Sequence, residues 1–440
     1  MEIIGQIVFI VVLVGSSVFF GYNVKKIINN IRLGRDEDRS DNKSERWKTM
    51  ARVALGQSKM TARPIAAVLH LFIYVAFIFT QIELIEIIID GSAGTERFFQ
   101  PYLGGLYTFI ISLIEILSLL ALVATFAFLS RRNLLKLPRF QKSEMNGWPK
   151  LDGNIILYLE FILVVCIFTM NGADEALHVK EGGESYGFVL SSIYGTSVFG
   201  GMELDTLHMF ERIGWWGHIL TVFAFIVYLP YSKHLHIFFA FPNTFYTKLK
   251  PKGQFTNMES VTNEVKLMLD PNADPYAVPE VDPNPVPQKF GAQDVQDLTW
   301  INILNAYTCT ECGRCTSECP ANMTGKKLSP RKIMMDVRDR AEEIGNGIRK
   351  EGKKWTDGKS LLGDYITEEE IWACTSCNAC VQACPVNIDP LEIIMDLRRY
   401  LVMEESKMPS ELATMNTNIE NNQAPWQFSP SDRLNWKDEA

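Results

Sequence analysis

The chain has 440 residues, of which 47% are hydrophobic and 21% are charged, and its formal net charge is −8. This length leaves room for two or three domains, and the modest acidic charge gives no basis for a nucleic-acid partner. Long apolar runs are concentrated in the first 245 residues, whereas the remainder is charged and interrupted by prolines. The sequence therefore predicts a membrane half followed by a soluble half.

Five stretches are apolar and long enough to cross a bilayer, which takes about 20 residues in a helix. They lie near residues 3–24, 65–89, 104–129, 154–170 and 213–240. The first lacks a basic leader and a small-residue cleavage site, so we expect a span rather than a cleaved signal peptide. The spans predict a mainly α fold, with a five-helix transmembrane bundle in residues 1–245.

The basic residues between the spans predict the orientation. Residues 31–63 carry nine Lys and Arg and residues 131–150 carry six, whereas 171–211 carries one Lys against seven acidic residues. Short loops rich in Lys and Arg stay on the cytoplasmic side. We therefore expect a multi-pass protein of the inner (cytoplasmic) membrane, with its N-terminus outside and its soluble half in the cytoplasm.

Histidines within the membrane half are candidate haem ligands. His70 lies near the cytoplasmic end of the second span, and His236 lies at a similar depth on the fifth. A b-type haem takes one axial ligand from each of two facing helices, so this pair predicts an inner haem b. His218 would share a helix face with His236 and predicts a second, outer haem with His178 or His208. The alternative for each is a buried His bonded to a backbone carbonyl.

The sequence gives less indication of a role for two other polar residues in the spans, His234 and Glu115. His234 is interpreted as an interfacial residue or one that contacts a haem propionate. Quinone chemistry couples electrons to protons, so a carboxylate facing a site in the bundle would be useful. Glu115, in the middle of the third span, is the best candidate, and a satisfied structural carboxylate explains it equally well.

Residues 246–294 are predicted to link the two halves. Six prolines within 271–290 exclude a continuous helix or a central strand there, so this part predicts an extended connector. The preceding stretch 257–270 predicts a short amphipathic helix.

The last third of the chain contains one cysteine pattern twice. The copies are Cys309-x2-Cys312-x2-Cys315-x3-Cys319-Pro320 and Cys374-x2-Cys377-x2-Cys380-x3-Cys384-Pro385. This run is typical of bacterial ferredoxins, in which the fourth Cys of each run ligates the other [4Fe–4S] cluster. The first cluster is therefore assigned to Cys309, Cys312, Cys315 and Cys384, and the second to Cys374, Cys377, Cys380 and Cys319. Structural zinc usually needs only paired spacings, and disulfides do not suit a reducing cytoplasm.

Each cysteine motif is followed by a helix start. Ser329-Pro330 and Asp389-Pro390 both match an N-cap with Pro at the first helical position. Residues 295–404 therefore predict a pseudo-repeated, α-helical domain with two [4Fe–4S] clusters. Residues 405–440 combine Asn and Pro with aromatic side chains, which predicts a tail that orders against a partner. An unstructured tail is the alternative.

Two cysteine-rich segments carry a family resemblance. TCTECGRCTSECPANMTGKKLSP and ACTSCNACVQACPVNIDPLEIIMDLRR resemble the helical ferredoxin module of heterodisulfide-reductase-type iron–sulfur subunits. The five-span part, with YSKHLHIFF closing the fifth span, is similar to the haem b membrane subunit of respiratory nitrate reductases. That resemblance implies His70 and His236 as inner haem ligands and His218 as an outer one. The second His that this family has on span two is absent.

The resemblance also implies a function. Catalytic subunits of the group carry Cys-Cys-Gly motifs, and this chain has no adjacent Cys pair. We therefore expect a membrane electron-transfer subunit that passes electrons between the quinone pool, menaquinone or ubiquinone, and a cytoplasmic iron–sulfur partner with Cys-Cys-Gly motifs. The alternatives are a self-contained quinone-linked oxidoreductase, for which no nucleotide, nucleophile or flavin motif is present, and a redox-sensing membrane scaffold.

Overall fold

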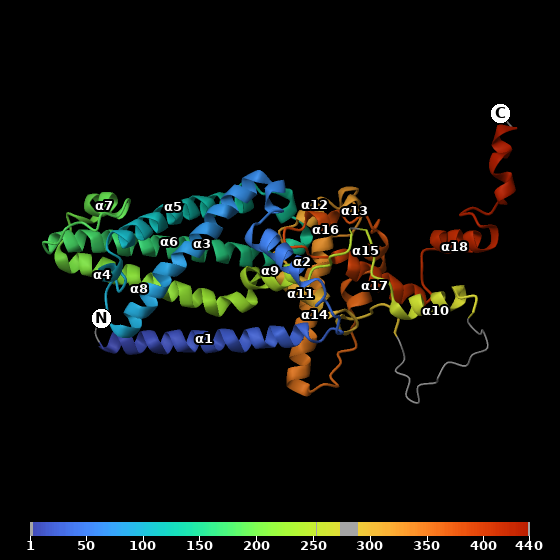
Figure 1. Cartoon of the computed structure of the whole chain (residues 1–440), viewed down its shortest axis with the longest axis horizontal. Coiled ribbons are helices and arrows are strands. Elements are labelled where there is room, and N and C mark those ends of the chain that lie inside the picture. Colours follow the sequence, from blue (N-terminus) through green and yellow to red (C-terminus); the bar gives the residue numbers. More distant parts are fainter. Residues whose placement is uncertain (1–2, 252, 273–288, 439–440) are drawn as a thin grey trace.

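The computed structural model describes residues 3–251, 253–272 and 289–438. The described chain is mainly helical, and its only pairings of strand type are two isolated bridges, Arg35 with Thr299 and Leu362 with Ile366. A bundle of long helices forms one end of the elongated molecule and a domain of shorter helices the other (Figure 1). The predicted mainly α fold is confirmed.

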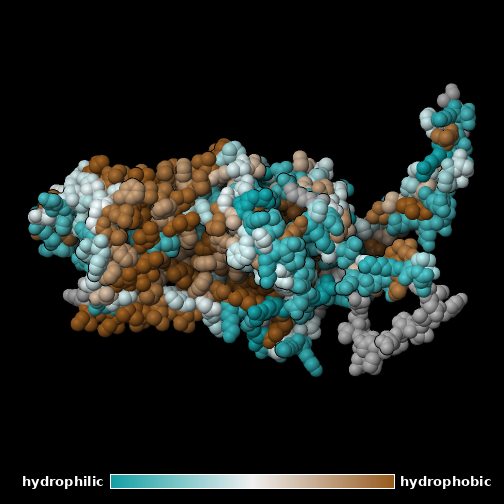
Figure 2. Space-filling model, in the orientation of Figure 1, coloured by the Kyte–Doolittle hydropathy of each residue, from teal (hydrophilic) through white to brown (hydrophobic). Residues whose placement is uncertain are grey.

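Five helices are long and apolar enough to cross a membrane. They are α1 (Ile3–Ile31), α3 (Pro64–Ala93), α5 (Gly105–Asn133), α6 (Trp148–Lys180) and α8 (Leu204–Tyr228). Apolar side chains cover most of the bundle surface in view (Figure 2). Val11, Phe109 and Phe126 of the bundle helices are each more than 60% exposed. So large an apolar surface is costly in water and is covered by lipid in a bilayer. The chain is a membrane protein with five candidate spans, as predicted.

The fifth span differs from its prediction. A single helix over 213–240 was expected, but α8 ends at Tyr228 and two 3-10 turns follow, Leu229–Tyr231 and Lys233–Leu235. Pro230 has no N–H to continue the helix, and α9 (His236–Phe245) begins only at His236. The expected shared helix face of His218 and His236 is therefore wrong, because the two residues lie on different helices.

Short elements connect the spans. On the side facing the second domain, α2 (Lys43–Met50), a π-helical turn (Ala51–Leu55) and a 3-10 turn (Met60–Ala62) lead from α1 to α3. At the opposite end lie α4 (Gln100–Leu103), α7 (Ser191–Tyr194) and a second π-helical turn (Gly195–Phe199) (Figure 1).

The second domain contains the cysteine motifs. Its helices are α11 (Trp300–Thr308), α12 (Arg314–Ser317), α13 (Pro320–Met323), α14 (Pro330–Glu351), α15 (Glu368–Trp372), α16 (Ala379–Ala383) and α17 (Pro390–Met403). The two predicted helix starts are present, since Ser329 accepts from the N–H of Lys332 and Asp389 from that of Glu392. The apolar core of this domain also includes Ile27 from α1, so the bundle and the domain pack together.

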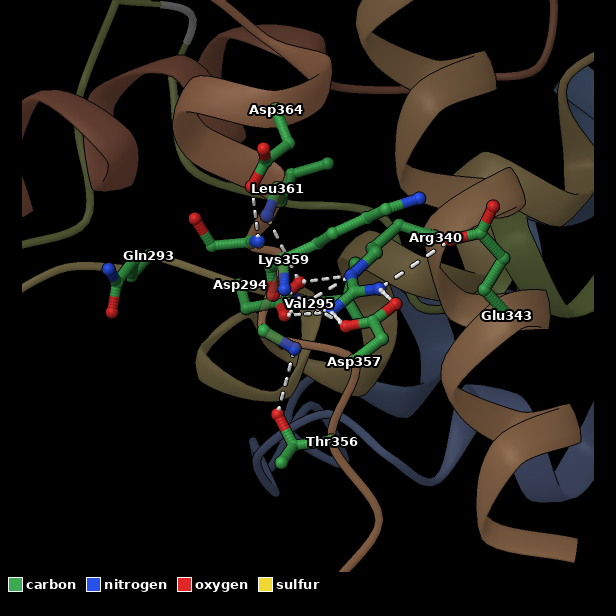
Figure 3. Close-up of polar contacts among 12 residues, drawn as sticks. Gln293, Asp294, Val295, Arg340, Glu343, Thr356, Asp357, Lys359, Leu361 and Asp364 are labelled. Carbon is green, nitrogen blue, oxygen red and sulfur yellow. Dashed lines mark hydrogen bonds and ion pairs between the residues drawn. The ribbon is translucent and has the colours of Figure 1, made fainter. Parts of the chain in front are cut away.

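Arg340 on α14 holds two loops of this domain (Figure 3). Its side chain is buried, with Nη2 2.9 Å from Oδ2 of Asp294 and Nη1 2.6 Å from Oδ2 of Asp357. Nη2 also donates to the carbonyl oxygen of Lys359 at 2.7 Å. The segment before α11 and the loop after α14 are thereby tied to one helix.

The predicted linker and tail are only partly described. Helix α10 (Glu259–Leu269) confirms the short helix expected at 257–270, while most of the Pro-rich connector lies outside the described residues. The tail contains α18 (Ser410–Asn422) and a 3-10 segment (Pro430–Lys437) that extend away from the second domain (Figure 1). Regular helix in this Asn- and Pro-rich segment was not expected.

Candidate metal centres

The eight motif cysteines form two groups of four. One group lines a single cavity and comprises Cys309, Cys312, Cys315 and Cys384. The other interacts electrostatically across the two motifs and comprises Cys319, Cys374, Cys377 and Cys380. Each group thus takes one member from the other motif, in the crossed arrangement of two-cluster ferredoxins. Ligation of iron by these residues stays a prediction.

Burial favours the neutral thiols of the first group. It raises the pKa of Cys309 to about 12 and that of Cys384 to about 11, because a thiolate loses its hydration in such a site. A bound metal would displace these protons, since coordination deprotonates a thiol outright.

The backbone of both motifs follows the same unusual path. Glu311 and Gly313 in the first motif have φ of 53° and 70°, and Ser376 and Asn378 at the equivalent places in the second have 57° and 60°. Such left-handed steps turn successive N–H groups towards one concavity, which suits an anion. The N–H of Ser376 lies 3.4 Å from Sγ of Cys374, and N–H···S bonds of this kind tune iron–sulfur clusters.

The sulfur atoms of each group do not meet at one point. Within the described parts of the chain, no three His, Cys, Asp or Glu side chains converge closely enough to hold a single metal ion. A cubane cluster instead receives four thiolates at separate corners. Arg331, fully buried in the wall of the first cavity, has an Nε–H without an acceptor, which a cluster sulfur would supply. The residues present therefore fit a cluster.

His70 and His236 are held in the same way. Nδ1 of His70 lies 3.1 Å from Oε1 of Gln57, and Nδ1 of His236 lies 3.1 Å from the carbonyl oxygen of Lys233. An oxygen acceptor fixes the hydrogen on Nδ1 and leaves Nε2 free for a metal, as in most metal-binding histidines. Each side chain can therefore offer Nε2 to a haem iron.

His234 lies beside this pair, and its expected contact with a haem propionate stays a prediction. Its ring centroid is 5.6 Å from that of His236. His234 also interacts electrostatically with both His236 and His70. The three histidines therefore lie near one another where the chain breaks after α8.

His218 lines a cavity of about 240 Å³ inside the bundle. Its Nδ1 lies 3.2 Å from the carbonyl oxygen of Leu163. Helices α3, α5, α6, α8 and α9 contribute to the walls, and the polar side chains that line the cavity with His218 are Thr80, Gln81, Glu83, Ser118, Glu160 and His234. The cavity thus combines apolar walls with carboxylates and imidazoles, a composition suited to a small amphipathic ligand.

The other predicted residues of the bundle lie elsewhere. His178 stacks on Tyr186 with ring centroids 4.4 Å apart, and His208 pairs with Glu181 at 3.6 Å. Neither lines the cavity of His218, and their pairing with it in an outer haem stays a prediction. Glu115 accepts from the N–H of Leu190 at 2.8 Å and is a satisfied structural carboxylate, whereas Glu83 and Glu160 line the cavity.

Comparison with known proteins agrees with the cysteine geometry. Residues 308–388 match the family described as the 4Fe-4S dicluster domain. This part of the chain is a dicluster ferredoxin domain. No solved structure matches the chain.

Three curated relatives are named as oxidoreductases or as a subunit of a reductase. The chain is 30% identical over its whole length to a probable iron-sulfur-binding oxidoreductase, FadF, of Bacillus subtilis, and 27% identical over 98% of its length to the EtfAB:quinone oxidoreductase of Syntrophomonas wolfei. It spans only 61% and 59% of these two proteins. Over 24% of the chain it is 31% identical to one component of a CoB-CoM heterodisulfide reductase of Methanosarcina acetivorans, covering 52% of that protein. The similarity to nitrate reductase haem subunits stays a prediction.

The dicluster domain meets the bundle beside the first cysteine group. Lys233, whose carbonyl oxygen holds His236, forms a buried ion pair with Glu311, which lies between Cys309 and Cys312. Arg338 on α14 completes the pair from the other side, with Nη1 2.8 Å from Oε1 of Glu311.

A second connection starts from the loop before α3. Lys59, two residues after Gln57, donates from Nζ to the carbonyl oxygen of Val381 at 3.1 Å and to Oδ1 of Asn387 at 2.9 Å. Nη1 of Arg314 donates to the carbonyl oxygen of Lys59 at 3.4 Å. Lys233, which holds His236, thus contacts the dicluster domain directly. Gln57, which holds His70, is two residues from Lys59, which also contacts that domain.

Proposed function

We propose that the chain is a membrane electron-transfer subunit linking membrane quinone to a cytoplasmic iron–sulfur partner. Its carriers would be a haem b held by His70 and His236 and two [4Fe–4S] clusters held by the two cysteine groups. The relatives support an iron–sulfur electron-transfer role, and the EtfAB:quinone oxidoreductase is named for quinone. The bound cofactors would carry the electrons, while the protein sets their spacing and potentials.

One observation carries the proposal. Lys233 contacts His236 through its backbone carbonyl and Glu311 through its Nζ, and Glu311 lies inside the first cysteine motif. A haem on His236 and a cluster on Cys309 and Cys312 would therefore be separated by a short run of bonded and hydrogen-bonded atoms. This arrangement supports direct electron exchange between the bundle and the dicluster domain.

The cavity of His218 is our candidate for the quinone site. His234 lines its wall and also packs against His236, so a quinone headgroup there would be near the inner haem. Reduction of a quinone takes up two electrons and two protons, and Glu83, Glu160 and His218 are groups that exchange protons. On this proposal His218 serves the quinone in place of the outer haem expected from the sequence, since neither His178 nor His208 lines its cavity, and one haem per chain is expected.

The proposed partner is a cytoplasmic iron–sulfur subunit with Cys-Cys-Gly motifs. Among residues 405–438, Trp426, Phe428 and Trp436 are 41%, 60% and 66% exposed. Exposed aromatic residues often become the main anchors of an interface. Their position on the tail, away from the bundle (Figure 1), supports docking of a partner at the far end of the dicluster domain.

The proposed location is the inner membrane, with the dicluster domain in the cytoplasm and the N-terminus outside. The basic loops 31–63 and 131–150 support this orientation, because they flank the bundle on the side of the dicluster domain. Arg63 and Glu144 on these loops bond to Glu318 and Arg331 of that domain.

The test is quinone-dependent oxidation of the purified protein in lipid nanodiscs. The preparation should first show about eight non-haem iron atoms per chain and no stoichiometric zinc, as two cubane clusters require. After reduction of haem and clusters, a menaquinone analogue should reoxidise both. A scaffold or sensor without electron-transfer function would show cofactors that the quinone leaves reduced.

A further inference from the structure

Arg331 is the largest fully buried side chain among the described residues. It follows Pro330 at the start of α14 and lines the cavity formed by the first cysteine group. Nη1 donates to the carbonyl oxygen of Arg139 at 2.7 Å and Nη2 to Oε1 of Glu144 at 2.8 Å. Its Nε–H has no acceptor. A buried N–H is rarely left unpaired, and a ligand in the cavity that Arg331 lines would complete its hydrogen bonding.

The first motif is built to admit this guanidinium. Gly313, between Cys312 and Arg314, has a φ of +70°, and a Cβ added there would lie 2.6 Å from Nη1 of Arg331. A side chain at this position would therefore displace Arg331 from the cavity. Glycine supplies both the left-handed backbone and the space.

The second motif has a different pair at the equivalent positions. Asn378 stands where the first motif has Gly313, and Leu391 follows Pro390 as Arg331 follows Pro330. Leu391 and Asn378 line one neighbouring cavity, and Leu391 is only 2% exposed. The pseudo-repeat thus places a buried cation beside the first cysteine group, whereas the matching position of the second motif holds a buried apolar side chain.

The remaining charges reinforce this difference. Arg314, 5% exposed, also lines the first cavity. Arg398 approaches the second group too, but it donates to the carbonyl oxygens of Ile371, Trp372 and Cys374. The first cavity therefore has two buried arginines in its wall, of which Arg331 is paired with Glu144, while Glu311 of the first motif is paired with Lys233 and Arg338.

We propose that Arg331 donates its Nε–H to a sulfur of the first cluster and raises the reduction potential of that cluster above that of the second. An added electron makes a cluster more negative, so a hydrogen bond and a buried cation stabilise its reduced form. Cys377 of the second group is exposed, and water also stabilises a reduced cluster. Water weakens the effect of any charge near the exposed second cluster, whereas the buried guanidinium of Arg331 is screened little. We therefore expect Arg331 to have the larger effect on the reduction potential.

A direction of electron flow follows, and it rests on the proposed function. One electron leaves the reduced second cluster and enters the oxidised first cluster, and no bond is made or broken. The first group lies beside the bundle, joined to it through Lys233 and Glu144. The potential difference therefore favours transfer from the cytoplasmic partner through the second cluster to the first, and on to membrane quinone.

The test is an EPR-monitored redox titration of the full chain, with Arg331→Leu, Arg331→Lys and Arg349→Leu beside the wild type. Arg331→Leu installs the residue of the second motif. Arg349→Leu removes a charge from the exposed far end of the same helix and is the matched control. We expect Arg331→Leu to lower the potential of one cluster by at least 59 mV, a tenfold change in a one-electron equilibrium, and Arg349→Leu to shift neither.

Arg331→Lys keeps the charge and loses the Nε–H donor, so it should shift the same cluster in the same direction by a smaller amount. If Arg331→Leu fails to assemble its cluster, the potential measured for Arg331→Lys tests the role of Arg331. Unchanged potentials in a variant with full iron content would overturn the role of Arg331. A wild type without two [4Fe–4S] signals would instead overturn the proposed function itself.

Discussion

Lys233 of the membrane bundle and Glu311 of the first cysteine motif form an ion pair whose side chains are 8% and 2% exposed. Asp152 approaches Lys233 at 3.7 Å, and Arg338 approaches Glu311 at 2.8 Å. Two acids and two bases thus balance in a buried network that crosses from the bundle into the dicluster domain. Because the carbonyl oxygen of Lys233 also holds His236, the network fixes the candidate haem site relative to the first cysteine group.

Replacement of Lys233 by Met should destabilise this junction. Removal of one partner from a buried pair leaves the other charge uncompensated, which typically costs about 3–5 kcal/mol. We expect faster proteolysis between the bundle and the dicluster domain and a lower unfolding temperature in detergent. Lys150→Met, an exposed residue near the same boundary, is the control and should behave as wild type. Equal stability of the two variants would show that the pair contributes nothing.

The haem site predicts a spectroscopic loss. Replacement of either His70 or His236 by Ala removes one Nε2 ligand, so the low-spin b-type haem should be absent while the five spans still insert. Pyridine haemochrome analysis of the wild type should give one haem per chain. His208→Ala, more than half exposed and paired with Glu181, should keep the full spectrum. If the His70 and His236 variants also keep it, the assignment of this pair is wrong.

Much of this arrangement could be predicted from the sequence. The five spans follow from the length of each apolar run, and the two cluster motifs follow from the spacing of their cysteines. Both features are local in the sequence and need no tertiary contacts to be predicted. The crossed grouping of Cys319 and Cys384 follows from the same spacing rule. By contrast, the break after Tyr228 was not predicted, because apolar residues on both sides of Pro230 and Lys233 favour one continuous span over 213–240.

Other features depend on contacts between distant segments. In the sequence, nothing distinguishes Lys233, Glu311 and Arg331 from exposed charged residues. Their burial becomes evident only when the bundle packs against the dicluster domain. The position of Glu115 in the middle of a span favours a carboxylate that faces a quinone site. In the structure its carboxylate instead accepts a hydrogen bond from the N–H of Leu190 in the outer connection. Hydrogen bonds to a loop 75 residues away in the sequence leave no periodic signal.

The Arg340 cluster predicts a defined pH response. The guanidinium of Arg340 lowers the pKa of Asp357 to about 2, below its usual value near 4. The folded-state pKa is the lower one, so the stabilisation is complete above about pH 4 and is lost as the pH falls towards 2. The unfolding midpoint of Asp357→Asn should therefore lie below that of wild type by a constant amount between pH 7 and 5.

Arg340→Met tests the same cluster from its centre. Its loss leaves Asp294 and Asp357 without their shared cation, and we expect about 3–5 kcal/mol of destabilisation, measured by denaturant unfolding of the full chain in detergent. Lys327→Met removes an exposed ion pair with Glu369 and should cost about 0–1 kcal/mol. A similar cost for both substitutions would contradict a structural role for Arg340.

The tail predicts a separable partner interaction. A chain ending at residue 409 should keep haem and iron content but lose a co-purifying cytoplasmic protein, because the exposed aromatic residues of the tail are removed. Replacement of Trp426, Phe428 and Trp436 by Ser should have the same effect without shortening the chain. Retention of the partner by both variants would show that it docks elsewhere.

The central claim is that electrons pass between the dicluster domain and quinone through the haem site, and freeze-quench EPR tests it most directly. Protein in nanodiscs is reduced anaerobically, freed of reductant and mixed with a menaquinone analogue, and reoxidation of the cluster signals is followed over time. Wild type should reoxidise within turnover times, and His236→Ala, with its clusters intact, should reoxidise at least tenfold more slowly. Equal rates in the two proteins would contradict the account, because electrons would then reach quinone without the haem site.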